Sequence, residues 1–472
     1  EKTLTISAAN DSFAGVISGA GALTLTSGNQ TLTGTNTYTG STTITAGTLA
    51  LTGSGSIATS AKLVANGAFD ISGTSTVASI ESLSGLSTGE VLLGDKTLTI
   101  SAANDSFAGV ISGTGAVTLT TGTQTFTSAN TYSGLTTING GTLIITHING
   151  LGTTTSGTTI ANGATLDLQN IALGAEAITI NGGSLITSTG TSSLSGTLTL
   201  GANSFIVVSG SELTLSGIIS GAHGITKSGA GTLILSGNNS YTGATVINGG
   251  ILSVSSLANG GSNSHIGAST NAASNLIING GTLKYTGATV TTDRLFTIGT
   301  DGAILDASGT GTLSFSNTGD LALSGNGNRT LTLKGSQSSS NLLASKLTNA
   351  SVGTTGLVKE GAGAWVLSNA NTYTGDTTIN AGTLRLTGSL SSLTDVVMSN
   401  AAIWDLQVAQ TVSTLTMSSG NSITNAAGSS ALTVSGASTL ANSITTSGTQ
   451  TYTGAVTLAA DDVLTGVNVT FA

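Results

Sequence analysis

The chain of 472 residues contains no cysteine and no proline, and it has few charged or aromatic side chains. Without cysteine, a disulfide framework or a cysteine-ligated zinc site cannot form. At average usage about two dozen prolines would be expected. Their absence indicates a backbone in which nearly every N–H group is needed for hydrogen bonding between strands.

Charge and long apolar runs are also scarce. Only 7% of the residues are charged, and the eleven lysines and arginines are spread from Lys2 to Arg385 without a cluster. Such a distribution cannot neutralise a run of phosphates, which excludes nucleic-acid binding. No apolar run exceeds four residues, as in Phe205–Val208, so no transmembrane helix is expected. The 38% of hydrophobic residues nevertheless favours a folded chain over a disordered one.

Short segments in which Leu, Ile or Val alternate with Thr or Ser recur throughout the chain. Examples are Thr3–Ile6, Leu23–Leu25 and Leu331–Leu333. This alternation is typical of strands with one buried and one solvated face. Glycine occupies 68 positions, many of them with Asn or Ser between the strands, where positive φ angles are tolerated. These patterns predict an all-β protein.

The strands belong to repeats. Residues 2–19 return unchanged at 96–113, an offset of 94. A second pattern recurs at 19–49, 113–143, 229–252 and 361–384, with a worn copy at 450–454. Coils this thin cannot hold a core alone, so such self-similarity indicates a solenoid. We expect a single continuous β-solenoid over 1–472, with repeat units at approximately 1–94, 95–200, 201–300, 301–400 and 401–472.

The second pattern contains a turn in which an asparagine, a tyrosine and a glycine alternate with other residues. Its tyrosines could form an aromatic row that stacks on glycans, or each ring could pack at a corner of its coil. Uneven intervals and the shared turn consensus favour the structural role. The predicted turn residues are Asn36, Tyr38, Gly40, Asn130, Tyr132, Gly134, Asn239, Tyr241, Gly243, Asn371, Tyr373, Gly375, Tyr452 and Gly454.

The segment GAGTLILSGNNSYTGATVINGGIL, which starts at Gly229, resembles the autotransporter-associated β-strand repeat, also called the passenger-associated transport repeat. The resemblance implies a right-handed parallel β-helix. It also implies export through the periplasm and outer membrane to the bacterial cell surface or the medium, often as an adhesin. A cysteine-free chain suits passage through an oxidising periplasm.

The chain stops at Phe471-Ala472 without a train of long amphipathic strands, and no separate secretion domain is visible at its start. We therefore expect a segment of a larger passenger, connected to the membrane only through a C-terminal barrel that is absent from these residues.

Candidate catalytic and metal sites are weak. Gly85–Gly89 matches the nucleophile-elbow pattern, but a chain this rich in Gly and Ser produces such matches by chance. His147, His223 and His265 lie in Gly-, Asn- and Ser-rich surroundings typical of exposed turns. The acidic residues Asp301, Asp306, Asp461 and Asp462 are interpreted as solvated turn residues. We expect no catalytic residue, no metal site and no cofactor.

Three functions are compatible with the sequence. The first is a structural or adhesive passenger stalk, with host or neighbouring-cell surfaces or glycans as partners. The second is a self-assembling extracellular filament or surface-layer subunit that associates end to end. The third is a β-helical polysaccharide-active enzyme, which is the weakest because only Arg294, Arg329 and Arg385 could serve a substrate groove. The sequence favours the first.

Overall fold

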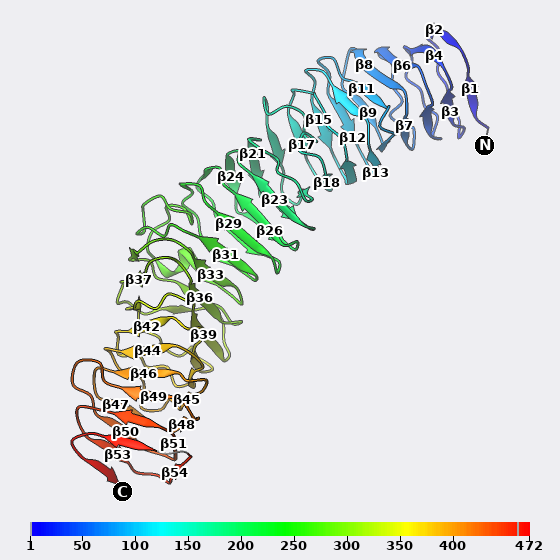
Figure 1. Cartoon of the computed structure of the whole chain (residues 1–472). Coiled ribbons are helices and arrows are strands. Elements are labelled where there is room, and N and C mark those ends of the chain that lie inside the picture. The colour runs from blue at the N-terminus through cyan, green and yellow to red at the C-terminus, as the bar shows by residue number, and fades with distance from the viewer. Residues whose placement is uncertain (1, 460–461) are drawn as a thin grey trace. The chain divides into compact units, whose positions relative to one another are not determined.

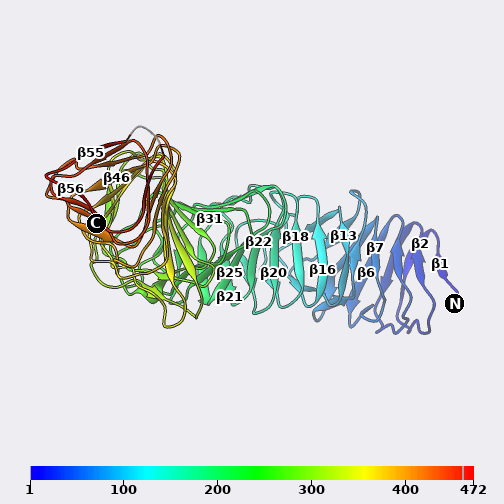
Figure 2. The same cartoon turned by 90° about the horizontal axis from the view of Figure 1, so that it is seen from below.

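The computed structural model describes residues 2–459 and 462–472. Contacts within the chain define two compact units, Glu1–Gly224 and Ile225–Ala472. In both units short strands stack as the successive coils of a solenoid (Figures 1 and 2).

In the first unit, the strands form stacked rows around the coil. The β1 sheet contains β1 (Leu4–Ile6), β3 (Leu23–Leu25), β5 (Thr42–Ile44), β7 (Leu63–Ala65) and β10 (Leu83–Ser84). The β2 sheet contains β2 (Ala9–Phe13), β4 (Gly28–Leu32), β6 (Thr48–Gly53), β8 (Ala68–Thr74), β11 (Glu90–Leu92) and β14 (Val110–Ser112). The β9 sheet contains β9 (Ala78–Ile80), β12 (Leu98–Ile100), β15 (Val117–Leu119), β17 (Thr136–Ile138), β19 (Thr158–Ile160), β21 (Ile178–Asn181), β24 (Leu198–Ala202) and β27 (Ile219–Ser220). The β13 row contains β13 (Ala103–Phe107), β16 (Gly122–Phe126), β18 (Thr142–Ile145), β20 (Thr165–Leu168), β22 (Ser184–Thr187) and β25 (Ser204–Val208), and β23 (Thr191–Leu194) pairs with β26 (Glu212–Leu215).

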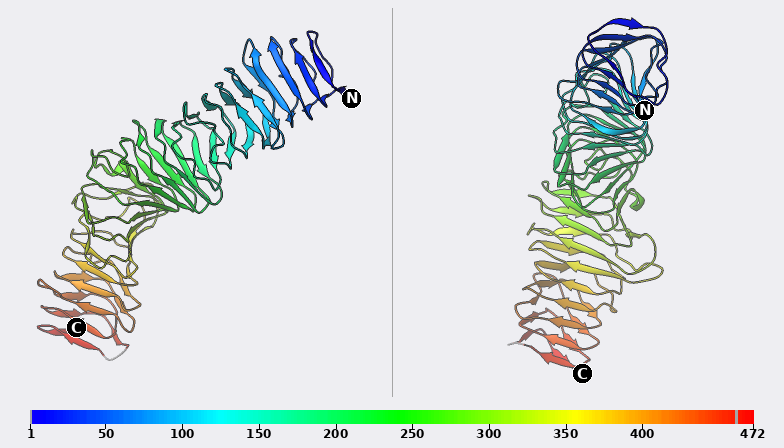
Figure 3. Two further views of the ribbon diagram at one scale, coloured as in Figure 1. Left: turned by 45° about the horizontal axis from the view of Figure 1, so that its top comes forward. Right: turned by 90° about the vertical axis from the view of Figure 1, so that its right-hand side faces the viewer.

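The second unit has the same construction (Figure 3). The β28 row contains β28 (Ile225–Ser228), β30 (Thr245–Ile247), β32 (Leu276–Ile278), β35 (Thr297–Ile298) and β38 (Ala322–Leu323). The β29 row contains β29 (Thr232–Leu235), β31 (Ile251–Val254), β33 (Thr282–Tyr285), β36 (Ala303–Ala307), β39 (Arg329–Lys334), β41 (Thr355–Lys359), β43 (Thr377–Ile379), β45 (Val396–Met398), β48 (Leu415–Met417), β51 (Ser438–Leu440) and β54 (Val456–Leu458). The β34 sheet contains β34 (Val290–Thr292), β37 (Leu313–Phe315), β40 (Asn341–Leu343), β42 (Ala364–Leu367), β44 (Thr383–Leu386), β46 (Ile403–Leu406), β49 (Ser422–Thr424), β52 (Ser443–Thr445) and β55 (Val463–Thr465). The β47 sheet contains β47 (Gln410–Val412), β50 (Leu432–Val434), β53 (Gln450–Tyr452) and β56 (Val469–Phe471).

Neighbouring strands in these rows run parallel, which confirms the prediction of an all-β parallel solenoid. Among the described residues, helical structure is limited to one 3-10 turn at Ala273–Asn275. No helix in this part of the chain is long and apolar enough to span a membrane. The predicted repeat boundaries stay predictions.

The alternation in the sequence separates an inward column of side chains from an outward one. In the β9 sheet, for example, Leu98, Val117 and Thr136 stack in register and are buried. The outward column of this sheet carries a hydroxyl at every level: Ser79, Thr99, Thr118, Thr137, Thr159, Thr179, Thr199 and Ser220. Threonine suits this position because its branched Cβ favours an extended backbone and stacks on its neighbours across strands.

The duplicated segment occupies different faces of the coil in its two occurrences. Residues 2–19, the first copy, start the β1 sheet, whereas in residues 96–113, the second copy, β12 pairs with β9 in another sheet. The following strand β13 lies beyond β10 through the bridge between Gly85 and Phe107. Four coils carry the chain from Leu4 to Leu83 in register, and Leu98 follows before a fifth coil is complete. The offset of the repeat is therefore not a whole number of coils.

Candidate functional site

The asparagines of the repeat turn are buried and connect neighbouring coils. The side-chain oxygen of Asn130 accepts a hydrogen bond of 2.8 Å from the backbone N–H of Ile111 in the preceding coil. Its amide nitrogen donates at 2.7 Å to the carbonyl of Gly150 in the following coil. Asn36 and Asn371 make the same two kinds of contact, and Asn239 donates to the carbonyl of His265. One side chain thus satisfies backbone groups that the turn leaves outside the strand ladder.

The tyrosine rings of the four clear copies lie in the interior, with at most 1% of the residue exposed. Each hydroxyl shares a hydrogen bond with the hydroxyl of the threonine four residues later. The pairs are Tyr38–Thr42 at 2.5 Å, and Tyr132–Thr136, Tyr241–Thr245 and Tyr373–Thr377 at 2.7 Å. Burial raises the pKa of Tyr38 to about 12, and it raises the pKa of the other three as well. Rings placed in this way present no stacking platform to a glycan.

The turn glycines lie against the backbone of the preceding coil. A Cβ atom built on Gly134 would stand 2.2 Å from the carbonyl oxygen of Gly115, and one on Gly40 would stand 2.4 Å from that of Gly21. Gly375 and Gly454 have equally close neighbours in Thr355 and Gly436. Close approach of two coils, rather than a positive φ angle, therefore excludes larger residues at these positions. Gly243, the remaining glycine of the predicted set, is half-buried.

The worn copy differs from the others. Tyr452 lies at the end of β53, is buried, and donates a hydrogen bond of 3.1 Å to the side-chain oxygen of Gln450. Its ring stacks on Phe471, with centroids 5.5 Å apart. Valine occupies the position four residues later, so the tyrosine–threonine pair of the other turns cannot form.

Two lysines occupy equivalent interior positions just before the Gly-Ala-Gly turns. The ammonium group of Lys227 donates to the carbonyls of Ser228, Gly229 and Gly249 at 2.8–3.2 Å. Lys359 donates to three carbonyls in the same way. Burial lowers the pKa of both lysines to about 8. The sequence shows that the two positions are equivalent, because each lysine stands two residues before a Gly-Ala-Gly segment. It does not show that they are buried, since a lysine in a short strand normally points to solvent.

The three arginines also serve the fold. The guanidinium of Arg294, 1% exposed, donates to the carbonyls of Ala258, Gly267 and Ser269 at 2.9–3.0 Å. Arg329 donates to carbonyls in the turn before β39. Arg385 pairs with the buried Asp405, with Nε and Oδ2 2.6 Å apart. The guanidinium groups that a substrate-binding groove would need are therefore occupied by contacts within the protein.

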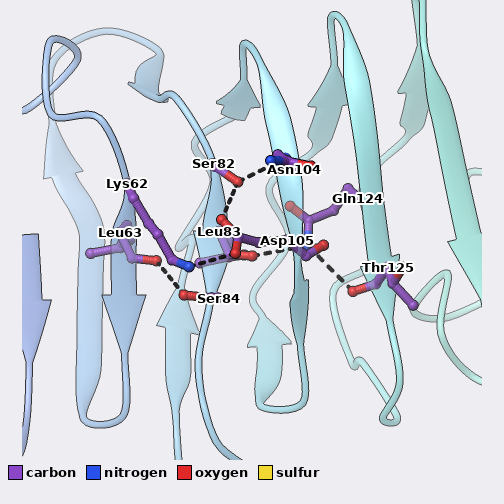
Figure 4. A network of polar contacts seen from close by, with 9 residues as sticks. All are labelled: Lys62, Leu63, Ser82, Leu83, Ser84, Asn104, Asp105, Gln124 and Thr125. Carbon is purple, nitrogen blue, oxygen red and sulfur yellow. Dashed lines mark hydrogen bonds and ion pairs between the residues drawn. The ribbon is translucent and has the colours of Figure 1, made fainter. Parts of the chain in front are cut away.

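A polar network spans four coils of the first unit (Figure 4). The carboxylate of Asp105 lies 2.5 Å from the Lys62 ammonium and accepts a hydrogen bond of 2.6 Å from the Ser82 hydroxyl. That hydroxyl in turn accepts from the backbone N–H of Asn104. Gln124 donates to the carbonyls of Asp105 and Leu83. The network connects residues of the second copy, 96–113, to the coils on both sides of it.

The histidines, the four aspartates and the Gly85–Gly89 segment were the weak candidates for catalysis or metal binding. Among the described residues, no three His, Asp or Glu side chains gather in a way that could hold a metal ion. The histidines are half-buried rather than exposed, which corrects the expectation. For example, the Nδ1 atom of His265 accepts a hydrogen bond from the backbone of Ser255, and burial lowers its pKa. Gly85–Gly89 forms a turn closed by a bond from the Gly89 N–H to the Leu86 carbonyl.

The predicted solvated aspartates divide into two groups. Asp301 is exposed and accepts a hydrogen bond of 3.1 Å from Asn279. Asp306 is half-buried within β36 and bonds to Ser308, so its assignment to a solvated turn was wrong. Asp461 lies outside the described residues, and the neighbouring Asp462 is half-buried.

A surface groove of about 360 Å³ lies over β39, β41 and β43 of the second unit. Asn328, Thr330, Thr354, Gly356, Asp376 and Thr378 contribute to its lining. It was not predicted, because it depends on which residues stand side by side in neighbouring coils.

The fold thus defines a parallel β-solenoid whose turns repeat the same interior contacts. Comparison with known families identifies four segments of this chain as passenger-associated transport repeats, at residues 27–51, 121–145, 225–254 and 357–386. Each overlaps one of the four clear copies in the sequence.

A 159-residue stretch is 42% identical to a protein named adhesin BmaC autotransporter from Brucella suis biovar 1 (strain 1330). The match covers 32% of this chain and 5% of that relative, so the chain spans a small part of the length of the protein it resembles. No solved structure matches the chain.

Proposed function

We propose that this chain is a β-solenoid stalk within an adhesive passenger at the surface of a bacterium. The observation that carries the proposal is the presence of four passenger-associated transport repeats within one parallel solenoid, each separated from the next by several coils. The similarity to a protein named as an autotransporter adhesin supports the adhesive part. Host or neighbouring-cell surfaces are the partners that this proposal implies.

The physical properties of the solenoid suit a stalk. Each coil adds about 4.8 Å of length. In the four clear repeat copies a buried asparagine bonds to neighbouring coils and a buried tyrosine bonds within the turn, and in two of them an interior lysine binds backbone carbonyls. The outward columns carry mostly hydroxyl and β-branched side chains, which give a repetitive polar surface of low charge. We propose further that the chain has no catalytic role. Two of its three arginines and the two interior lysines are engaged with backbone carbonyls, and among the described residues no three His, Asp or Glu side chains gather.

Adherence of cells that display the full-length protein tests the proposal. Removal of residues 2–472 is expected to lower adherence to host-cell monolayers, with surface display of the remaining protein monitored by antibody. Removal of residues 20–113 is the matched control, because identical copies precede both breakpoints and the sequence at the junction stays native. This shorter stalk should still be displayed and should retain part of the adherence. Full adherence without residues 2–472 would contradict the proposal.

A further inference from the structure

The groove over β39, β41 and β43 arises from one gap in an outward column of side chains. Thr330 and Gly356 stand in register on β39 and β41. Asp376 precedes β43 and lies next to Gly356. A Cβ atom built on Gly356 would stand 3.2 Å from the Asp376 carbonyl oxygen. Two residues further along, the same column is filled by Thr332, Val358 and Thr378. The glycine therefore opens a notch in a surface that is otherwise continuous.

The backbone does not demand a glycine at this position. The φ angle of Gly356 lies outside the left-handed region that favours glycine. Its nearest neighbour, at 3.2 Å, requires only a small adjustment to admit a Cβ atom. At Gly375, in contrast, the carbonyl oxygen of Thr355 would stand 2.6 Å from a Cβ atom. Close packing against the neighbouring coil explains why Gly375 is a glycine. At Gly356 the main effect of the missing side chain is the open space at the surface.

The groups around the notch are free to bind. In the part of the chain that the structure describes, the Thr330 hydroxyl, the Thr378 hydroxyl and the Asp376 carboxylate make no hydrogen bond or ion pair within the protein. At one end, the Asn328 side-chain oxygen accepts from the backbone N–H and the hydroxyl of Thr354, which fixes these two residues. Val358 supplies an apolar wall.

We propose that this groove binds one unit of a neutral sugar, as a contact site within the adhesive function proposed above, on which the inference rests. The Asp376 carboxylate accepts hydrogen bonds from two sugar hydroxyls, the Thr330 and Thr378 hydroxyls bond to others, and Val358 packs against ring C–H groups. The volume lies within the range of small-ligand pockets. Arg329 also lines the groove, but it is 5% exposed and donates to the carbonyls of Ser324 and Gly325. The exposed Asp376 carboxylate therefore selects against anionic sugars through repulsion.

The affinity of a single groove is expected to be weak. Aromatic rings, which bury large apolar areas against ligands, do not contribute to the lining. A dissociation constant on the order of 1 mM is therefore expected for one sugar unit. Many displayed copies would raise the avidity for a cell surface.

Saturation-transfer NMR on the purified chain tests the inference with methyl α-mannopyranoside, methyl β-galactopyranoside and methyl β-glucopyranoside, each at about 10 mM. At least one should receive saturation from the wild-type chain. Gly356→Val, which fills the notch, should abolish the signal, and Asp376→Asn should weaken binding about tenfold because a charge-assisted hydrogen bond is lost. Gly356→Ala provides a milder filling if the valine variant folds poorly, as judged by its circular dichroism melt.

Thr416→Val is the matched control, because Thr416 is an exposed outward residue of the same row on β48, outside the groove. It should bind like the wild type. The inference is overturned if none of the three sugars binds, if folded Gly356→Val or Gly356→Ala binds as well as wild type, or if Thr416→Val loses binding too. Adherence that persists in displayed Gly356→Val, after sugar binding is lost, would remove the groove from adhesion and leave the proposed function intact. A displayed wild type that binds sugar without adhering would instead contradict the proposed function alone.

Discussion

Residues 2–19 and 96–113 have the same sequence and form the same local strands, yet their side chains lie in different environments. Leu4 and Phe13 of the first copy are 45% and 44% exposed, whereas Leu98 and Phe107 of the second are 0% and 1% exposed. β9, β10 and β11 lie against the second copy, whereas the first copy opens the 472-residue chain, so that none of these residues forms an earlier coil against it. The sequence of a coil thus determines its strands, and the neighbouring coils determine its burial.

Polar groups follow the same rule. Gln30 and Gln124 are equivalent, and each donates to carbonyls in its own strand and in the coil before it. Gln124 also donates to the carbonyl of Leu83, one coil further away. Asp11 is exposed, while its equivalent Asp105 binds Lys62 and Ser82. The same residues therefore acquire additional partners when another coil is stacked on them.

The largest difference between the copies is expected for a charge in the inward column. Leu98→Asp should lower the free energy of unfolding by about 4 kcal/mol, because it places an unpaired carboxylate in a buried position. In the isolated 472-residue chain, Leu4→Asp makes the same change at an exposed position and should cost less than about 1 kcal/mol. Urea unfolding, with hydrogen exchange of the β12 and β1 peptides, measures both. Equal effects would show that the two copies share one environment.

The next largest difference concerns the two phenylalanines. Phe107→Ala should cost about 3–5 kcal/mol, because it opens a cavity in a packed interior. In the isolated 472-residue chain, Phe13→Ala removes a ring that is already partly hydrated, so a cost of about 1–1.5 kcal/mol is expected. Thermal unfolding of the two variants side by side provides the measurement. A ratio of the two costs near one would show that the rings are buried to the same extent in solution.

The free energy of unfolding is expected to depend on pH through Tyr38 and Tyr132, which follow the two copies in the sequence. Burial raises the pKa of Tyr38 to about 12 and also raises that of Tyr132, for which Glu176 adds a further repulsion. Since the folded pKa lies above the unfolded value of about 10, the unfolded state loses its protons first. The contribution of these two tyrosines to the free energy of unfolding is therefore full below pH 10 and is lost as the pH rises towards 12.

Tyr38→Phe and Tyr132→Phe should each reduce this alkaline loss by up to about 2 kcal/mol, as measured by urea unfolding at a series of pH values. Each variant also removes a buried hydrogen bond to a threonine, so its stability at neutral pH serves as the reference. A slope between pH 10 and 12 that neither substitution changes would contradict the assignment of the buried hydroxyls.

The strand positions could be predicted from the sequence because alternation and turn residues are local signals. The all-β solenoid followed from them together with the repeats, and its parallel strand arrangement was implied by the resemblance to the passenger-associated transport repeat. The face on which each copy lies could not be predicted, since it depends on the accumulated length of all earlier coils. Leu98 occupies a different face from Leu4 although residues 96–113 and 2–19 have the same sequence.

The polar contacts and the groove could not be predicted either, because they also depend on residues in neighbouring coils. Lys227 and Lys359 were seen as equivalent positions, but only the fold shows that three carbonyls surround each ammonium group. The notch at Gly356 becomes visible only when Thr330 is placed beside it in register. Half-burial of the histidines and of Asp306 likewise depends on adjacent coils, whose position a single-coil pattern does not contain.

The smallest expected difference lies in the polar network of Figure 4. Asp105→Asn should lower the free energy of unfolding by about 1 kcal/mol, because it weakens the contacts with Lys62 and Ser82. Part of this cost should disappear in high salt, since the Lys62 side chain is 38% exposed and its charge is screened. Asp11→Asn, the same change in the first copy, should have no measurable effect at either ionic strength. A double-mutant cycle with Lys62→Met isolates the ion pair, and a coupling energy near zero would assign the cost to the Ser82 hydrogen bond instead.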